Sequence, residues 1–176
     1  MKGAGLRLRL AVRYGIGNTR HILVSAPLMA EILHCYPLDG LSLAGKTIVD
    51  VGCDFGNSPL YWWLNKAFKV IAYEKDRHKV ELMKPLLGEP WLEFRGEWKG
   101  EMPDADGFKI DIEGGEKILN IPRLQKYQFW FVALHEPPFG DTMGMAPELR
   151  ALGGEIVHRQ AGETVFRGRA ERDYIT

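Results

Sequence analysis

Two short apolar runs, each closed by a carboxylate, constrain this chain more than any other feature. The first run, residues 46–51, leads into a turn that contains Gly52 and Gly56 and then into a helix start. The second run, residues 69–73, ends at Glu74, twenty-two residues after Gly52. A glycine turn lets backbone N–H groups approach a ligand, and an acid at the end of the next strand can bind two ribose hydroxyls. This layout predicts a nucleotide-binding α/β fold.

The bulk properties narrow the class of protein. A chain of 176 residues predicts one domain, which can bury a core without disulfides. The formal net charge is zero, so no field of the whole molecule attracts nucleic acid or a membrane. Cys35 and Cys53 are the two cysteines, and we expect reduced thiols and a cytoplasmic location. No apolar stretch has the length of a membrane span, and the basic N-terminus lacks the apolar segment of a signal peptide.

Strand-like and helix-like segments alternate along most of the chain, which predicts a mostly parallel sheet covered on both faces. Strands are expected at 46–51, 69–74, 91–98, 107–112 and 129–134. Helices are expected at 26–36, 59–67 (capped by Ser58), 77–84 (capped by Asp76), 115–119 and 146–152. Two hairpins are expected, one at the N-terminus from 6–14 and 21–24, and one at the C-terminus from 155–159 and 163–167. The C-terminal strands add an antiparallel element to the sheet.

The link between Trp98 and Gly107 has only eight residues, and they look non-helical because Gly100, Pro103, Asp104 and Asp106 are among them. Its eight residues can still span the sheet if the first four strands lie in the order 3-2-1-4, since extended residues reach about 3.3–3.6 Å each. One patch of the sheet would then be bare. We expect that patch to be covered by a second copy of the chain, in a homodimer, or by the N-terminal hairpin.

The glycine turn favours a ligand with a cationic part over a phosphate. It is not Gly-x-Gly-x-x-Gly, because Asp54 and Asn57 stand where glycines would be, and Asp50 adds a second acid. The amino group and the sulfonium of S-adenosyl-L-methionine are cationic groups of this kind, and Glu74 would bind the ribose hydroxyls of the same ligand. The alternative is a tight turn after a buried strand, with Glu74 solvated. The candidate cofactor-binding residues are Asp50, Gly52, Cys53, Asp54, Gly56, Asn57, Ser58, Glu74, Lys75, Trp98 and Asp111.

A second group of candidates follows the later strands. Asp111 and Glu113 alternate at one strand end, and His135 closes the next strand, so all three are expected at the ligand-binding edge of the sheet. We expect them to surround an acceptor, with His135 or Asp111 as the base. The alternatives are a loop histidine bonded to backbone and, for Glu113 and Glu116, acids that favour a helix start. Trp98 either stacks on an adenine or packs in the core.

These motifs resemble those of class I S-adenosylmethionine-dependent methyltransferases. Residues 49–56 and 72–76 match motifs shared across that superfamily, and Phe108-Lys109-Ile110-Asp111-Ile112-Glu113-Gly114-Gly115-Glu116 resembles the signature of its FkbM-type branch. The segments 134–136 and 152–157 follow the same pattern, so the resemblance spans roughly 46 to 169. It implies that Asp50, Gly52 and Gly56 hold the methionine part, that Glu74 binds ribose, and that Asp111 lies near the methyl group.

The resemblance implies a Rossmann-like sheet, mostly parallel with an antiparallel C-terminal strand. The N-terminal β-hairpin that the residue pattern predicts before this sheet has no counterpart in the family. We expect residues 1–176 to form a single methyltransferase-like domain, with the hairpin at 1–25 and the cofactor-binding core at 46–170. The expected activity is methyl transfer from S-adenosyl-L-methionine to oxygen of a small-molecule or glycan-like acceptor, with no metal and no membrane partner. Two alternatives stay open: a non-catalytic binding module or subunit of the same fold, and an RNA methyltransferase that grips RNA with the arginines of 6–14.

Overall fold

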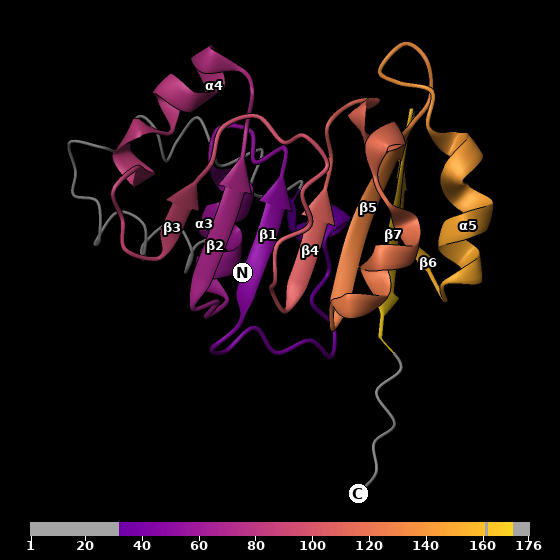
Figure 1. Cartoon of the computed structure of the whole chain (residues 1–176), viewed down its shortest axis with the longest axis horizontal. Helices are drawn as coiled ribbons and strands as arrows, with labels where there is room; N and C mark the ends of the chain where they lie inside the picture. Colours follow the sequence, from indigo (N-terminus) through magenta and orange to yellow (C-terminus); the bar gives the residue numbers. More distant parts are fainter. Residues whose placement is uncertain (1–31, 161, 171–176) are drawn as a thin grey trace, which may run out of the picture.

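The protein is built around a seven-stranded sheet with the order β3-β2-β1-β4-β5-β7-β6 (Figure 1). The computed structural model describes residues 32–160 and 162–170. The strands are β1 Thr47–Val51, β2 Lys69–Tyr73, β3 Leu92–Phe94, β4 Gly107–Ile110, β5 Phe129–His135, β6 Glu155–Gln160 and β7 Glu163–Arg169. The pairs among β1 to β5 are parallel, and β7 pairs antiparallel with both β5 and β6. The predicted α/β sheet and its C-terminal hairpin are confirmed, and the first four strands take the 3-2-1-4 order that the short link allows. The predicted N-terminal hairpin lies outside the described residues.

The helices are short. They are α3 Asn57–Leu64, α4 Arg77–Leu82 and α5 Ala146–Ala151, with 3₁₀ turns η2 Lys84–Leu86, η3 Gly115–Ile118, η4 Ile121–Lys126 and η5 Met143–Met145. Residues 32–35 are also helical. In the described part of the chain, no helix combines the length and apolarity needed to traverse a bilayer.

One of the two predicted helix caps is correct. Asp76 caps α4, with its side chain accepting hydrogen bonds from the backbone N–H groups of His78 and Lys79. The prediction for Ser58 is wrong, because α3 begins at Asn57, two residues earlier than predicted, and its cap position is Gly56, at a left-handed φ of 86°. Ser58 lies buried inside the first turn instead. The glycine turn is therefore one continuous unit with the helix that follows it.

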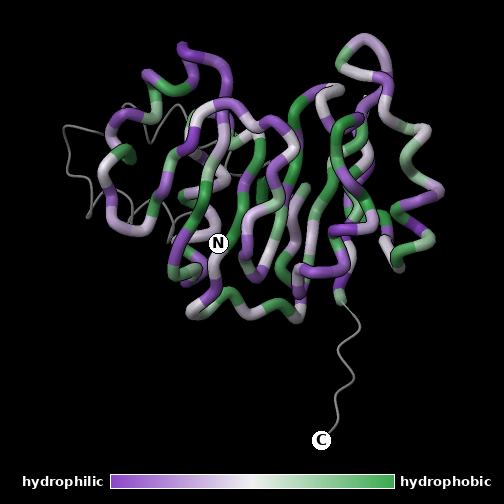
Figure 2. The backbone as a smooth tube through the Cα atoms, in the orientation of Figure 1, coloured by the Kyte–Doolittle hydropathy of each residue, from purple (hydrophilic) through white to green (hydrophobic). Residues whose placement is uncertain are grey.

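Strand alternation divides the core into two layers. The hydrophobic residues of these layers lie largely on the strands of the sheet, as the backbone coloured by hydropathy shows (Figure 2). On one face, Ile48 and Phe131 pack with Trp62 of α3 and with the helix at 32–35. On the other face, Val49 and Val132 pack with residues of η4 and α5. Successive residues of a strand point to opposite faces, so each central strand feeds both layers. The same alternation determines to which face of the sheet the polar side chains near the strand ends point.

The link between β3 and β4 contains no helix, as its residues predict, yet the sheet below it is not bare. Trp98 and Met102 of the link are buried, at 7% and 5% exposed. The rings of Trp98 and Tyr127 lie 6.3 Å and 5.0 Å from that of Phe108 on β4. The link and η4 therefore cover the patch themselves, and a second copy of the chain is not needed to bury it.

Gly168 on β7 is the clearest test of the packing between β5 and β7. It lies opposite Trp130, and a Cβ at this position would stand 2.0 Å from the buried Trp130 ring. Because the ring is fully enclosed, overpacking should make Gly168→Ala less stable by about 1–3 kcal/mol in urea unfolding. Gly144→Ala is the matched control, since a Cβ there meets nothing within 4 Å. Equal stability of the two variants would contradict this packing.

Candidate functional site

A cavity of about 480 Å³ opens at the edge of the sheet where the parallel strands end. Ligands bind at this edge in open α/β sheets, and the volume lies within the roughly 300–1,000 Å³ of small-molecule sites. Most of the predicted site residues line it: Gly52, Asp54, Asn57, Ser58, Glu74, Lys75, Trp98, Asp111, Glu113 and His135. Asp50, Cys53 and Gly56 do not line the cavity.

Asp50 lies beneath the cavity, because on β1 it points to the same face as Ile48 and so towards α3. It is fully buried, accepts a hydrogen bond from Trp62 Nε1 (2.8 Å), and has Lys109 Nζ 3.3 Å from its Oδ1. Burial raises the pKa of Asp50, while the Lys109 ammonium and the Trp62 N–H oppose that rise. The prediction that Asp50 holds the ligand directly is not supported by this position; its contacts fix Lys109 and α3.

Lys109 is a site residue that the sequence analysis did not single out. Its ammonium donates to the carbonyl oxygen of Gly52 (2.6 Å) and lines the cavity. Burial lowers the pKa of Lys109, but Asp50 and Asp111 outweigh burial and the net direction is upward. The available signal was a lysine between Phe108 and Ile110 inside a buried strand, since lysine is almost never buried without a partner.

Gly52 is needed for the close approach of the turn to the end of β4. Its φ is 75°, and a Cβ would stand only 1.8 Å from the carbonyl oxygen of Asp111. Gly56 has a similar structural role, because a Cβ there would meet Leu86 at 2.6 Å. Cys53 contacts Met83 Sδ at 3.7 Å, and burial raises the pKa of its thiol. Cys53 and Gly56 therefore support the turn from behind, away from the cavity.

The start of α3 offers unpaired polar atoms to the cavity. Asn57 Nδ2 and Ser58 Oγ are buried and have no hydrogen-bond partner within residues 32–160 and 162–170. Both residues line the cavity. Buried polar groups are almost always hydrogen-bonded, so atoms of this kind in a cavity wall mark a place where a ligand can supply the partner.

Glu74 faces the cavity and is held there by backbone. Its two carboxylate oxygens accept hydrogen bonds from the N–H groups of Asp54 (3.0 Å) and Asp76 (2.9 Å). Each oxygen keeps a further lone pair for a ligand hydroxyl. Asp54, at a φ of 52°, pairs with Lys79 at 2.8 Å, a cation that the sequence analysis did not name. The alternative prediction, in which Glu74 is directed into solvent, is wrong, because its carboxylate lines the cavity.

Asp111 lies just beyond β4 and is the centre of the second predicted group. Its Oδ2 accepts a 2.7 Å hydrogen bond from the Tyr36 hydroxyl, and its Oδ1 lies 3.4 Å from His135 Nε2. Burial raises the pKa of Asp111, but Lys109, His135 and Tyr36 together outweigh it and bring it to about 2. Asp111 is therefore an ionised hydrogen-bond acceptor at neutral pH. Burial and Asp111 raise the pKa of Tyr36, which stays a donor.

His135 is surrounded by carboxylates. Besides Asp111, Glu116 Oε1 lies 3.4 Å from Nδ1 and Glu163 Oε2 lies 3.7 Å from Nε2. Burial lowers the pKa of His135, but these three acids outweigh it and raise the pKa to about 11. An imidazolium has no free lone pair, so this geometry argues against His135 as the base. The contact between His135 and Asp111 instead holds the Asp111 carboxylate in position.

Of the remaining predicted residues, Trp98 and Glu113 line the cavity and Glu116 stabilises the backbone next to it. Trp98 both lines the cavity and packs in the core, with its Nε1 donating to the carbonyl oxygen of Glu101. Glu113 is exposed at the rim, at a φ of 52°. Glu116 is buried, and its carboxylate accepts hydrogen bonds from the N–H groups of Ile112 and Gly114, which confirms its interpretation as an acid at a helix start.

The charge around the cavity is acidic on balance. Six carboxylates line it, against three lysines and His135. Three of the six are already engaged by cations, Asp54 by Lys79 and both Asp111 and Glu163 by His135. The cavity therefore has fewer unpaired carboxylates than the sequence predicted. The net charge of its lining is still negative, which favours a ligand with a cationic part over a polyphosphate.

Two curated proteins resemble the chain in sequence. Uncharacterized protein 65 of Sulfolobus islandicus filamentous virus (isolate Iceland/Hveragerdi) is 38% identical over 108 residues, which cover 54% of this chain and 63% of that protein. Uncharacterized protein 158B of Sulfolobus islandicus rod-shaped virus 1 is 37% identical over 102 residues, which cover 54% and 65%. The chain thus spans less than two thirds of each relative. No protein-family model matches it.

Solved structures decide the fold. The C-terminal domain of precorrin-6Y C5,15-methyltransferase from Rhodobacter capsulatus superposes with a TM-score of 0.60 at 12% identity, covering 82% of this chain and 89% of that one. The chain has the fold of the class I methyltransferases. A suspected RNA methyltransferase from Pyrococcus horikoshii has a TM-score of 0.56 at 15% identity (81% and 82% covered). Fibrillarin from Aeropyrum pernix, solved with bound S-adenosyl-L-methionine, has 0.51 at 12% identity (70% and 66% covered).

The imidazolium of His135 predicts a pH-dependent stability. A histidine whose pKa rises from an unfolded value of about 6.5 to about 11 contributes stability that is complete below pH 6.5 and is lost as the pH rises towards 11. The melting temperature gap between the natural protein and His135→Gln should therefore be widest near pH 6 and narrow by pH 10. His78→Gln, on the exposed side of α4, is the control. A gap that stays constant or widens with pH would contradict the carboxylate cage.

Proposed function

We propose that this protein binds S-adenosyl-L-methionine and transfers its methyl group to a hydroxyl of a small-molecule or glycan-like acceptor. The observation that carries the proposal is that Glu74 and Asp111 line one cavity. Glu74 is held by two backbone N–H groups, and Asp111 is kept ionised by three neighbours. A nucleoside-binding carboxylate and an acceptor-binding carboxylate thus lie at one edge of a class I methyltransferase sheet.

The cavity wall fits the parts of the cofactor. Glu74 would take the ribose hydroxyls, and the unpaired atoms of Asn57 and Ser58 would bind the methionine part beside the Gly52 turn. Trp98 offers an aromatic surface for the base. The acidic balance of the cavity suits the amino group and the sulfonium. When bound, the cofactor supplies a methyl group that is already activated, so the protein has to align the acceptor and exclude water.

Asp111 would orient the acceptor. A carboxylate with a pKa of about 2 is a weak base but a strong hydrogen-bond acceptor, so it can accept the hydrogen bond of the acceptor's O–H and leave an oxygen lone pair directed at the methyl group. Once the oxygen takes the methyl group its proton becomes strongly acidic, and this carboxylate would receive it. Tyr36 and His135 position Asp111, and Glu113 at the rim contacts the outer part of the acceptor. Alignment of this kind supplies roughly 7–11 kcal/mol of a two-reactant barrier.

The first test is binding. S-adenosylhomocysteine at one hundred times its dissociation constant should stabilise the protein by about 2.7 kcal/mol, which is roughly 5–10 °C in melting temperature for a chain of this size. Glu74→Gln should lose most of that shift, because it removes the charge that binds ribose. Glu148→Gln, exposed on α5, should keep the full shift. No shift in the natural protein would favour the alternative of a non-catalytic module.

The second test is methyl transfer. With labelled S-adenosyl-L-methionine and a panel of hydroxylated small molecules and glycans, Asp111→Asn should reduce the rate about 10²-fold through misalignment of the acceptor. Its shift with S-adenosylhomocysteine should persist. Asp141→Asn, an exposed aspartate outside the cavity lining, is the matched control. An unchanged rate in Asp111→Asn would remove Asp111 from the acceptor site.

RNA methylation is the second candidate. It is favoured by the fold similarity to the suspected RNA methyltransferase of Pyrococcus horikoshii. It predicts RNA affinity that falls steeply with salt, since phosphate contacts release counterions. Membership of the FkbM-type branch stays a prediction that depends on residues 108–116.

A further inference from the structure

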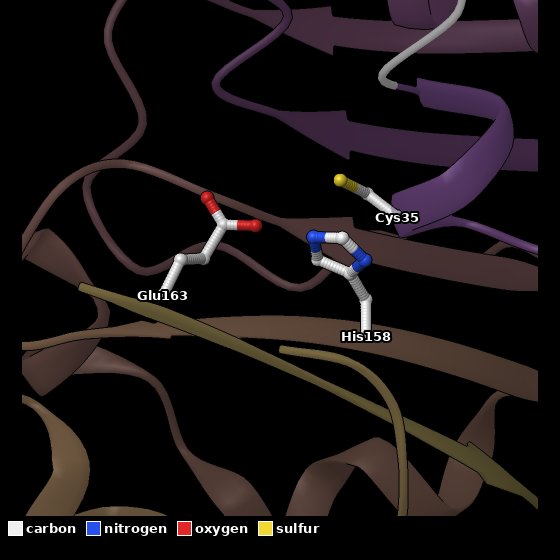
Figure 3. A group of neighbouring side chains, drawn as sticks. All are labelled: Cys35, His158 and Glu163. Atoms are coloured by element: carbon white, nitrogen blue, oxygen red, sulfur yellow. The ribbon is translucent and has the colours of Figure 1, made fainter. Parts of the chain in front are cut away.

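Three side chains of different chemistry converge beside the cavity, on the side of the C-terminal hairpin. Cys35 comes from the helix at 32–35, His158 from β6 and Glu163 from the start of β7. Their sulfur, nitrogen and carboxylate oxygen atoms lie within 4.8 Å of one another. Figure 3 shows the three groups directed towards a common point. None of the three belongs to the residues that the sequence analysis selected.

Two of these side chains are left with unsatisfied buried atoms. His158 Nε2 and Glu163 Oε1 are buried and have no hydrogen-bond partner in the part of the chain that the structure describes. A buried polar atom without a partner costs about 1–3 kcal/mol. The other carboxylate oxygen of Glu163, Oε2, is the one that faces His135. Glu163 can therefore serve the carboxylate cage with one oxygen and a further ligand with the other.

A β-bulge turns His158 towards this point. The register of β6 against β7 shifts between Ile156, opposite Phe166, and His158, opposite Val165. Without the shift, His158 would lie opposite Thr164 and point to the other face of the sheet, because a change of one residue reverses every side chain. The bulge thus directs the imidazole to the same face as Glu163 and Cys35. Bulges commonly redirect a side chain next to a functional site.

A second group with possible metal ligands, Asp111, Glu116 and His135, differs in the feature that matters. Both oxygens of Glu116 accept backbone hydrogen bonds, and Asp111 accepts one from Tyr36. His135 Nδ1 is also buried without a hydrogen-bond partner in the described residues, but both carboxylates of that group are held by protein donors. In the hairpin group the carboxylate oxygen Glu163 Oε1 is unpaired as well as the imidazole of His158, and this difference favours the hairpin group as the one that lacks a ligand.

We infer that Cys35, His158 and Glu163 form a binding site for a divalent transition metal, with Zn²⁺ as the best match. Thiolate, imidazole and carboxylate are the zinc ligands of proteins, and three of them with an open fourth position form the usual reactive arrangement. Bond lengths of about 2.0–2.3 Å require only a modest contraction of the group. Cys35 and Glu163 also line the cavity, so the open position faces it. The inference revises the expectation that the protein needs no metal, and it does not depend on the proposed methyl transfer.

Cobalt substitution tests the site on the full, tag-free chain. After removal of metals with a chelator, Co²⁺ should bind at one equivalent with a thiolate-to-cobalt charge-transfer band, and Zn²⁺ should displace it. Cys35→Ser should abolish the band. Cys53→Ala is the matched control, because Cys53 is the other buried cysteine and contacts Met83 instead. Binding without the band, or a band that survives in Cys35→Ser, would overturn the assignment.

A second variant keeps the test independent of any folding defect at Cys35. His158 is only partly buried, so His158→Gln should fold, and it should weaken Co²⁺ binding at least tenfold. His78→Gln on α4 should leave the affinity unchanged. Unchanged affinity in His158→Gln, or less than half an equivalent of bound Co²⁺ in the natural protein, would show that the three side chains are not a metal site.

Discussion

The buried ammonium of Lys109 is the interaction on which the site depends. It joins the carboxylate of Asp50 to the carbonyl oxygen of Gly52. Its Nζ atom also lies over the Tyr36 ring, 5.4 Å from the ring centroid. Removing one partner of a buried ion pair costs about 3–5 kcal/mol, because the other charge is left without compensation. Lys109 thereby fixes the glycine turn of β1 to the end of β4. The two halves of the cavity cannot separate without breaking that contact.

Strand alternation explains why these polar groups meet on one side of the sheet. Asp50, Lys109 and His135 follow the same parity as the residues that pack against α3 and the helix at 32–35. The parallel strands end at one edge, so alternation and direction together bring a lysine, a histidine and several acids to a single corner. The antiparallel hairpin of β6 and β7 then brings Glu163 to the far wall of that corner. The chemistry of the cavity is a consequence of the strand pattern.

Much of the fold could be predicted from the sequence. The apolar runs and the glycine turn predicted the parallel sheet, the short link was compatible with the 3-2-1-4 order, and Glu74 and Asp111 were placed at the ligand-binding edge. The pairings within the site could not be predicted. Asp50 and Asp54 looked like free carboxylates, but their partners Lys109 and Lys79 come from other elements, and only the packing shows which cation reaches which acid. The same holds for His158, whose direction depends on a one-residue bulge.

A crystal structure with S-adenosylhomocysteine would show whether Glu74 and Asp111 form one cofactor site. We expect one molecule in the cavity of about 480 Å³, with both ribose hydroxyls on the Glu74 carboxylate and the sulfur directed towards Asp111. A cavity closed by protein side chains in the crystal, or a nucleoside bound elsewhere with Glu74 directed into solvent, would contradict this expectation.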